Sequence, residues 1–357
     1  MDETTKLLKE LTETHGVPGY ESEIRALLRD YFAGLGTVTQ DKLGSLICHR
    51  EGEGPKVMLA GHMDEIGFMV QHLTEDGFIK FLQLGGWWDQ VLLGQRVIIK
   101  SHKGDVIGVI GAKPPHLLNA EERDKVVQKK NMFIDIGARS REEVQEVGVR
   151  VGDPAVPQSD FAILANGETY LSKAFDDRIG CAIVIDVLRN FAQDGTLSQP
   201  NNLYGVATVM EEVGVRGATT SARAIDPDVA IILESDIAGD VPGIKEEECS
   251  IRLGGGPSVL VYDARMIPNL KLRNLVIDTA EELDIPLQFS AMPGGATDGA
   301  AVHLHGTGVP TVVVAVPARH IHSHGAIIHR DDYDRAVQLV TTLVSRLDEE
   351  TVSGLTE

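Results

Sequence analysis

The sequence predicts an α/β fold in which a mostly parallel sheet, with helices on both faces, is interrupted by an inserted β domain. In the first and last parts of the chain, apolar strands alternate with helical patterns, which is typical of parallel sheets. From Gly67 to about Ala165, short β-rich runs punctuated by Gly, Asp or Pro replace that alternation and indicate a small barrel or sandwich. The 357 residues, 43% hydrophobic and 24% charged, suffice for two domains or for one with an insertion.

The N-terminal part predicts two helices and a buried strand. Apolar residues recur at helical spacing from Thr4 to Thr14 and from Glu21 to Phe32, and a Gly-Val-Pro-Gly run separates the two helices. The segment from Lys56 to Ala60 is short and apolar, which predicts a buried strand. This strand runs directly into Gly61 and His62.

The middle part predicts strands with little helix. Its apolar runs are short and are bounded by turn residues, and only Arg139 to Val147 has a helical pattern. The predicted strands are Phe68 to His72, Phe78 to Leu82, Arg96 to Ser101, Val106 to Ile110 and Met132 to Ile136.

After Ala165 the alternation of helix and strand returns. The predicted helices are Arg178 to Phe191, Asn269 to Leu283 and Tyr333 to Leu347, and the predicted strands are Leu203 to Val209, Val229 to Leu233 and Thr311 to Val316. In sheets of this type, ligands bind beyond the carboxyl ends of the strands. Polar clusters at those ends are therefore the candidate sites.

Composition excludes several classes of partner and points to the cytoplasm. The formal net charge of −20 disfavours nucleic acid, whose phosphates need clustered Lys and Arg. No stretch approaches the roughly 18 apolar residues of a membrane span, and the N-terminus has no signal-peptide pattern. Cys48, Cys181 and Cys249 are far apart and form no CxxC motif, so we expect reduced thiols in a cytoplasmic protein without membrane contacts.

Five polar clusters follow predicted strands or begin a predicted helix. Each of them alone also fits solvated loop side chains, and paired aspartates are ordinary at a helix start. Together they place imidazoles and carboxylates at one edge of the sheet. The candidate residues are His62, Asp64, Asp176, Asp177, Glu211, Glu212, Glu234, Asp236, His320, His322 and His324.

These side chains are metal ligands by type. His62 and Asp64 fall on one side of an extended strand end, so that His62 could bind a metal ion while Asp64 orients its ring. One of the paired glutamates, Glu211 and Glu212, could bind a metal ion while the other carries protons. Mixed nitrogen and oxygen ligands without thiolates suit Zn²⁺, Co²⁺ or Mn²⁺. A carboxylate that bridges two such ions predicts metal-assisted hydrolysis.

Motifs in a fixed order run through most of the chain. They include GHMDEIGFMV from Gly61, AFDDRIGC from Ala174, EEVGVRGA from Glu211, GGATDGAAVH from Gly294 and HIHS from His320. In these motifs and their order, the chain resembles the M42 family of metallo-aminopeptidases, which includes glutamyl and deblocking aminopeptidases and the tetrahedral TET particles. The resemblance implies a phosphorylase/hydrolase-like metallopeptidase domain, formed by residues 1–69 and 163–357. Residues 70–162 would form an inserted β-barrel dimerisation domain.

The resemblance also implies which residues bind metal. His62, Asp176 and Glu234 would hold one divalent ion. Asp176, Glu212 and His322 would hold the other, with Asp176 as the bridge. Zn²⁺ or Co²⁺ would be the ions, with Mn²⁺ as an alternative.

Catalytic roles follow from the same resemblance. Glu211 would be the general base that takes a proton from the nucleophilic water bridging the two metals and passes it to the leaving amine. Asp64 would orient His62, and Asp177 would follow Asp176 across a cis peptide bond. The substrates would be peptides with a free N-terminus, and the protein would be a homo-oligomer, either a dimer or a tetrahedral dodecamer.

Two departures from the family pattern leave alternatives open. Many relatives have Asp where this chain has Glu234, and Asp236 lies close enough to compete with Glu234. His320 replaces a Tyr that is common in the family and could compete with His322.

The alternative functions are another amidohydrolase, a glycan-degrading enzyme and an inert metal-storing scaffold. A glycosidase would need a separate pair of carboxyl groups around a sugar groove. The paired glutamates argue against the scaffold, because they leave one carboxylate free to act as a base.

Overall fold

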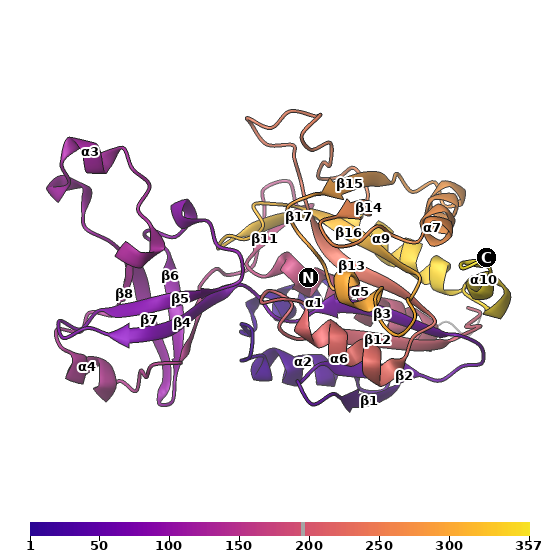
Figure 1. Cartoon of the computed structure of the whole chain (residues 1–357), viewed down its shortest axis with the longest axis horizontal. Coiled ribbons are helices and arrows are strands. Elements are labelled where there is room, and N and C mark those ends of the chain that lie inside the picture. The colour runs from indigo at the N-terminus through magenta and orange to yellow at the C-terminus, as the bar shows by residue number, and fades with distance from the viewer. Residues whose placement is uncertain (194–196) are drawn as a thin grey trace.

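The computed structural model describes residues 1–193 and 197–357, which form an α/β body and a β-barrel that projects from one side of it (Figure 1). The main helices are α1 (Glu3–Glu13), α2 (Ser22–Phe32), α3 (Ala120–Arg123), α4 (Arg141–Glu146), α5 (Phe175–Gln193), α6 (Arg216–Ile225), α7 (Leu270–Glu282), α8 (Gly299–Val302), α9 (Arg330–Val344) and α10 (Glu349–Gly354). The body's strands are β1 (Thr37–Gln40), β2 (Leu46–Arg50), β3 (Lys56–His62), β10 (Ala162–Ile163), β11 (Thr169–Ser172), β12 (Asn202–Thr208), β13 (Val229–Ile237), β14 (Ser258–Asp263), β15 (Gln288–Met292), β16 (Thr311–Arg319) and β17 (Ala326–His329). The barrel strands are β4 (Gly67–Leu73), β5 (Ile79–Leu84), β6 (Arg96–Ser101), β7 (Gly104–Gly111), β8 (Phe133–Asp135) and β9 (Pro154–Pro157).

The body is built on one large sheet whose centre is parallel. Its strand order is β1-β2-β12-β3-β13-β16-β17-β11-β10, with β14 and β15 branching from β16. The central strands β12, β3, β13 and β16 pair in parallel, whereas β2, β17 and β11 add antiparallel margins. The carboxyl ends of the central strands therefore meet at a single edge of the sheet.

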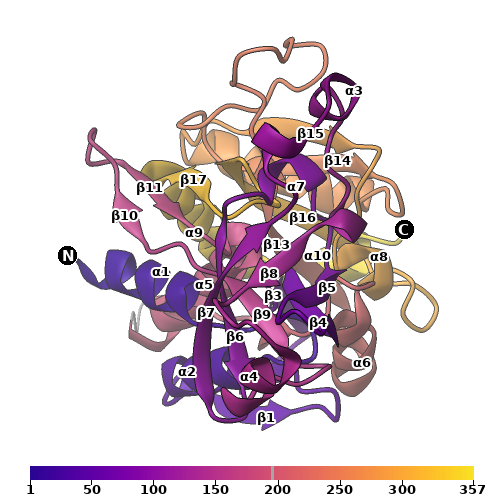
Figure 2. The same cartoon turned by 90° about the vertical axis from the view of Figure 1, so that its left-hand side faces the viewer.

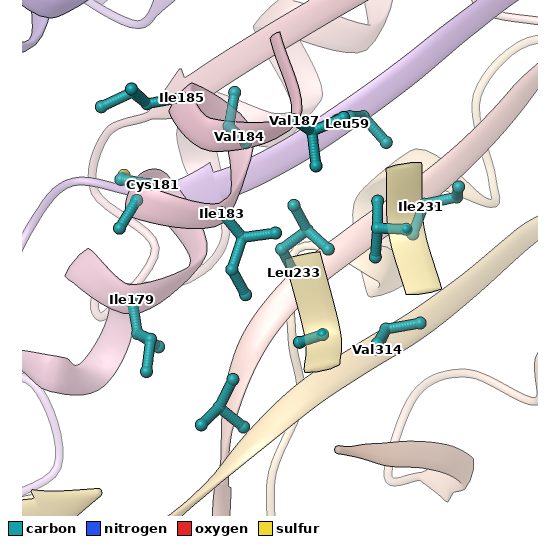
Figure 3. Packing of buried hydrophobic residues seen from close by; sticks show 14 of the residues in the cluster. Leu59, Ile179, Cys181, Ile183, Val184, Ile185, Val187, Ile231, Leu233 and Val314 are labelled. Atoms are coloured by element: carbon teal, nitrogen blue, oxygen red, sulfur yellow. The ribbon is translucent and has the colours of Figure 1, made fainter. Parts of the chain in front are cut away.

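Alternation along the central strands builds a core on each face. In β3, Val57 and Leu59 pack into the larger core, whereas Met58 and Ala60 pack into the smaller one. The larger core contains α5, shown against Leu59, Ile231, Leu233 and Val314 in Figure 3, together with α1, α2, α7 and α9. Helices α6 and α8 cover the opposite face. Both faces are buried, so most positions in the central strands are apolar, and polar residues such as His62 and Glu234 lie toward their carboxyl ends.

The inserted segment forms a closed barrel rather than a sandwich. Its strand order is β4-β5-β8-β7-β6-β9, and the barrel faces the viewer in Figure 2. The barrel has a hydrophobic core of its own. The barrel strands begin at Gly67 and end at Pro157. The division of the chain at residues 70–162 stays a proposal.

The predicted α/β class with an inserted barrel is confirmed. The predicted helices and strands named above all overlap observed ones, although α5 begins at Phe175, before the predicted Arg178, and α9 begins at Arg330 rather than Tyr333. The marginal strands, β14, β15, α6 and α8 were not predicted. Across residues 1–193 and 197–357, no helix has the length and apolar character needed to cross a membrane.

Candidate metal centre

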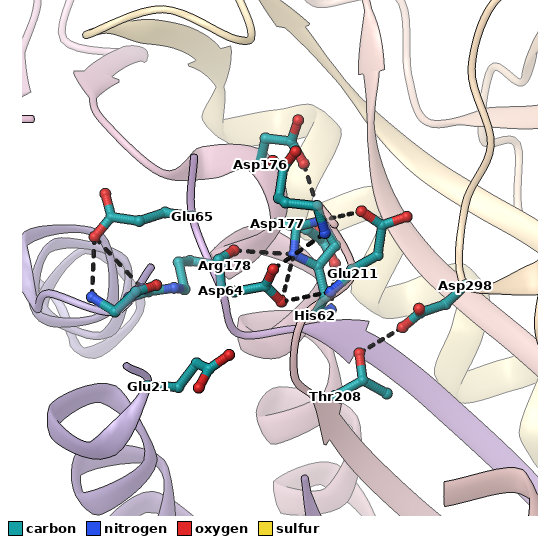
Figure 4. A network of polar contacts seen from close by, with 12 residues as sticks. Glu21, His62, Asp64, Glu65, Asp176, Asp177, Arg178, Thr208, Glu211 and Asp298 are labelled. Atoms are coloured by element: carbon teal, nitrogen blue, oxygen red, sulfur yellow. Dashed lines mark hydrogen bonds and ion pairs between the residues drawn. The ribbon is translucent and has the colours of Figure 1, made fainter. Parts of the chain in front are cut away.

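The predicted ligands come together at the carboxyl edge of the sheet, although they lie far apart in sequence. Figure 4 shows His62, Asp64, Asp176 and Glu211 gathered at this edge. The positions are the end of β3 for His62, the first turn of α5 for Asp176, the turn after β12 for Glu211 and Glu212, the interior of β13 for Glu234 and the loop after β16 for His322.

Asp176 lies between the two imidazoles. Its Oδ1 is 3.1 Å from His62 Nε2, and its Oδ2 is 3.2 Å from His322 Nε2. A second carboxylate accompanies each ring, since Glu234 Oε1 is 3.7 Å from His62 Nε2 and Glu212 Oε2 is 3.8 Å from His322 Nε2. The arrangement is two imidazole–glutamate groups that share one aspartate.

Asp64 is buried and holds the two glutamates through their backbone. Its Oδ1 accepts a hydrogen bond from Glu211 N at 3.0 Å, and its Oδ2 accepts one from Glu212 N at 3.1 Å. His62 Nδ1 instead lies 2.9 Å from the backbone carbonyl oxygen of Asp64 and 3.6 Å from its carboxylate. The sequence predicted that Asp64 orients His62, but did not predict that its carboxylate serves Glu211 and Glu212.

Asp177 is tied to the backbone around it. Its Oδ2 accepts a hydrogen bond from His62 N at 2.9 Å and its Oδ1 accepts one from Gly180 N at 2.9 Å. The cis peptide bond between Asp176 and Asp177, which the family resemblance implied, is confirmed.

Among the residues that the structure describes, two combinations of side chains offer ligand atoms within 4.8 Å of one another. His62 groups with Asp177 and Glu234, and His62 also groups with Asp176 and Glu212. We favour Asp176 over Asp177 as a ligand because both oxygens of Asp177 already accept backbone hydrogen bonds, whereas those of Asp176 face the imidazoles.

The competing acid, Asp236, is engaged elsewhere. One of its oxygens accepts from the Ser258 hydroxyl at 2.6 Å, and the other accepts from the Ser290 hydroxyl at 3.0 Å. Glu234 is the acid whose carboxylate approaches His62. This geometry favours Glu234 as the ligand.

Of the three alternating histidines, only His322 approaches Asp176. His320 is exposed at the wall of the cavity. His324 is buried against Trp87, with ring centroids 5.2 Å apart, and its ring nitrogens have no hydrogen-bond partner among the described residues.

Negative charge is concentrated in this site. Burial, together with the charges of Asp298 and Glu212, raises the pKa of Glu211 well above its usual range, against the opposing charge of His62. Burial and the charge of Asp176 raise the pKa of Glu212 to about 8. Burial lowers the pKa of His322, but its contact with Asp176 outweighs this effect and brings the pKa to about 10. Such a cluster is stabilised by added positive charge.

The donor set fits divalent metal ions. Two imidazole nitrogens and several carboxylate oxygens converge here, a set of donors that Zn²⁺, Co²⁺ and Mn²⁺ accept. Glu212 Oε1 is buried and has no hydrogen-bond partner among the described residues, so it is free to bind an ion.

The site opens into a cavity of about 1070 Å³. The described walls of the cavity include the ligand residues and apolar side chains such as Ile237, Val241, Ile244 and Met292. Behind Glu211, the buried Asp298 accepts a hydrogen bond from the hydroxyl of Thr208, and burial raises its pKa to about 6 (Figure 4). The sequence reasoning missed Asp298, although it lies in the quoted GGATDGAAVH motif.

The sequence model described as M42 glutamyl aminopeptidase matches residues 44–339. The chain belongs to the M42 family. Members of this family are metal-dependent peptidases, and the candidate ligand groups of the chain agree with that. A second model, described as AMPT, matches residues 2–28.

Relatives of this M42 chain match it over nearly its whole length. The lysyl aminopeptidase of Pyrococcus furiosus is 34% identical over 96% of this chain and 97% of its own length. The crystal structure of a TET aminopeptidase from the marine sediment archaeon Thaumarchaeota archaeon SCGC AB-539-E09 is 48% identical, with a TM-score of 0.97 over 99% of both chains. The TET1 peptidase of Pyrococcus horikoshii, which can assemble into a tetrahedron or a large octahedral shell, is 31% identical, with a TM-score of 0.84 over 97% of this chain and 100% of its own.

Proposed function

We propose that this protein is an aminopeptidase that hydrolyses N-terminal residues from peptides at a centre for two divalent metal ions. The observation that carries the proposal is the position of Asp176 between His62 and His322, each ring accompanied by a glutamate. Membership of the M42 family supports the same activity.

The two groups correspond to two metal positions. His62, Asp176 and Glu234 would hold one ion, and Asp176, Glu212 and His322 would hold the other. Zn²⁺ or Co²⁺ fits these ligands, with Mn²⁺ as the alternative. When bound, the ions would polarise the scissile carbonyl and lower the pKa of the attacking water that they share.

Glu211 would serve as the proton carrier. Its backbone is fixed by Asp64, and its side chain lines the cavity without being assigned to either ion. As a general base it would take the proton of the attacking water, and as a general acid it would return that proton to the leaving amine. Burial, which raises its pKa, makes the carboxylate a stronger base and so favours the first of these steps.

The same charge distribution supports cleavage from the amino end. A free α-amino group is a cation, and the carboxylates of Glu211, Glu212 and Glu234 line the cavity. A peptide whose N-terminus enters the cavity would place this cation beside the acidic side chains. An internal peptide bond carries no such charge.

We also propose a homo-oligomer, either a dimer or a tetrahedral dodecamer, in the cytoplasm. The barrel exposes apolar side chains such as Leu82, Trp88, Ile107 and Leu117, which suits an interface between copies. The assembly of the Pyrococcus horikoshii relative supports a larger particle. Light scattering tests this, because a monomer as the only species at micromolar concentration would contradict the proposal.

Glu211→Gln tests the proposed base. The amide keeps the shape of the side chain but cannot accept the proton, so kcat on aminoacyl p-nitroanilides should fall by about 10²- to 10⁴-fold. Elemental analysis should still find both metal ions, because Glu211 is not a proposed ligand. Near-normal kcat in Glu211→Gln would remove Glu211 from this role.

Glu282→Gln is a matched control at an exposed salt bridge with Arg346 and should leave kcat unchanged. The same preparations distinguish the alternative functions. Turnover of a β-glucan instead of the anilides would favour a glycosidase, and no turnover with both ions bound would favour a scaffold.

A further inference from the structure

A segment of the inserted domain lies against the second metal position. Gly85, Gly86 and Trp87 directly follow strand β5 of the barrel. The backbone carbonyl oxygen of Gly86 lies 2.8 Å from Nδ1 of His322, a residue of the α/β body that is 236 positions away in sequence. The other ring nitrogen of His322 faces Asp176.

At this contact, the surrounding atoms leave no space for a side chain on Gly85 or on Gly86. A Cβ on Gly86 would lie 2.8 Å from His322 Nδ1 and 3.0 Å from His322 Cε1. The φ of Gly86 is not positive, so glycine is required there for space rather than for its backbone conformation. A Cβ on Gly85 would lie 2.8 Å from Glu212 Oε2, and Gly85 has a φ of +85° as well.

Trp87 holds this segment between barrel strand β4 and the His324 loop of the body. Its indole Nε1 donates a hydrogen bond to the Gly67 carbonyl oxygen at 3.0 Å, and its ring stacks on Phe68 with centroids 4.7 Å apart. The Trp87 ring also lies against the imidazole ring of His324, two residues after His322. Trp87 is 5% exposed, whereas its neighbour Trp88 is 60% exposed.

His322 is partly exposed and lies in a loop with unusual backbone angles. His320 and His322 both have left-handed φ values, +63° and +55°, which non-glycine residues adopt rarely. The side chain of His322 is 39% exposed. A hydrogen bond from Nδ1–H to a fixed carbonyl holds the ring and leaves the Nε2 lone pair for a metal ion.

We infer that Gly85, Gly86 and Trp87 position His322 and Glu212, so that the inserted domain completes the second metal position. This inference rests on the proposed two-metal function. Gly86 acts through its carbonyl oxygen and its missing side chain, and Trp87 acts by anchoring Gly86. All three are positioning residues, since none of them is placed to touch the reacting atoms.

Metal titration of the chelated, full-length protein tests the inference. Co²⁺ is added while its visible absorption is recorded, and equilibrium dialysis counts the bound ions. We expect two ions per chain for the native sequence. Gly86→Ala should weaken the second ion by about 100-fold and Trp87→Phe by about 10-fold, the range found when the partner of a metal ligand is removed, while the first ion binds as before.

The controls separate this effect from general damage. Gly354→Ala places a Cβ where it meets no atom within 4 Å, and Trp88→Phe alters an exposed ring next to the anchor. Both should bind two ions as the native protein does. Trp87→Phe adds no bulk, so it decides the test if Gly86→Ala does not fold.

The outcomes distinguish this inference from the proposed function. Native protein that binds fewer than two ions contradicts the two-metal proposal itself. Native protein that binds two ions, with the same two affinities in Gly86→Ala and Trp87→Phe, overturns the positioning role alone. Equal weakening of both ions in these variants also overturns it, because it would show a general loss of structure.

Discussion

At the scale of single residues, Asp64 contacts two proposed metal ligands and the proposed general base. Its carbonyl oxygen contacts the ring of His62, a proposed ligand, and its carboxylate binds the backbone N–H groups of Glu211 and Glu212. One buried residue thus contacts a proposed ligand of each ion, His62 through its backbone and Glu212 through its side chain, and its side chain also holds the proposed base. The positions of Glu211 and Glu212 depend on both carboxylate oxygens being acceptors.

We expect Asp64→Asn to reduce catalysis more than stability. The amide has only one oxygen, so one of the two N–H groups would face an NH₂ group instead of an acceptor. Displacement of Glu211 or Glu212 should lower kcat by about 10- to 100-fold, as for other residues that support a metal site. The measurement is steady-state kinetics on an aminoacyl anilide, together with the melting temperature.

Asp332→Asn provides a matched control for this change. Asp332 is buried and its two oxygens likewise accept from two backbone N–H groups, those of Gly254 and Gly256, but it is not among the candidate site residues. It should lower the melting temperature by a similar amount and leave kcat near normal. A kcat loss as large in Asp332→Asn as in Asp64→Asn would contradict a specific role for Asp64.

The sequence predicts the residues that contribute side-chain chemistry and misses those that contribute backbone. His62, Glu212 and Glu234 are recognisable because imidazoles and carboxylates stand out after apolar strands. The carbonyl of Gly86 and the missing side chain of Gly85 have no chemical signature in sequence. Their effect depends on contacts made only in the folded chain.

At the scale of elements, strand β3 and helix α5 meet glycine to glycine. A Cβ on Gly61 would lie 2.6 Å from the carbonyl carbon of Gly180 and 2.7 Å from the backbone nitrogen of Cys181. This close approach brings the end of β3, which carries His62, next to the start of α5, which carries Asp176. Backbone atoms on both sides leave nothing that can rotate away.

Gly61→Ala should therefore destabilise the fold by about 1–3 kcal/mol, the usual cost of added volume in a packed interior. Urea unfolding measures the change. Gly354→Ala, where the added Cβ meets open space, should change the free energy of unfolding by less than about 0.5 kcal/mol. If Gly61→Ala is as stable as Gly354→Ala, the close contact does not constrain β3 and α5.

Helices and strands with a clear pattern of apolar residues are predictable from sequence. Elements that form because of contacts with other parts of the fold are not. β3, β13 and β16 are buried on both faces, so each of them contains a continuous run of apolar residues. Helix α6 is rich in small and hydroxyl-bearing residues because it packs closely on β12, where a Cβ on Gly217 would meet the backbone of Val209. The same small residues weaken its helical signal. Two of the marginal strands, β2 and β11, pair with β12 and β17, which are distant in sequence.

At the scale of the whole molecule, the barrel and the body would form one functional unit if the proposed second metal position is correct. The sequence predicted the insertion from its change in composition, and the family resemblance assigned it to dimerisation. Neither indicated that the segment after β5 reaches His322, because that contact spans 236 positions. The proposed second metal position thus depends on how the two parts pack together.

Removal of the metal should make stability depend on pH in a defined direction. In the metal-free protein, the pKa of Glu212 is raised from 4.5 to about 8. At pH values between these two, Glu212 is therefore protonated in the folded chain and ionised in the unfolded chain. The pKa of His322 is raised from 6.5 to about 10, so its contribution is full below 6.5 and is lost as the pH rises through 10. Both groups make the metal-free protein less stable as the pH rises.

Bound ions should reverse this trend, because they bind the deprotonated ligands. After chelation, the melting temperature should be lower at about pH 8 than at about pH 6, and the gain on adding Zn²⁺ should be larger at about pH 8. An ion present at about 100 times its Kd adds about 2.7 kcal/mol to the free energy of unfolding, which a thermal melt resolves. Glu212→Gln removes one of the two titrations, so its metal-free protein should show a smaller change between the two pH values. A zinc-induced gain that is equal at both pH values would mean that the clustered carboxylates and imidazoles do not bind the ions, and the two-metal centre would then have to lie elsewhere in the molecule.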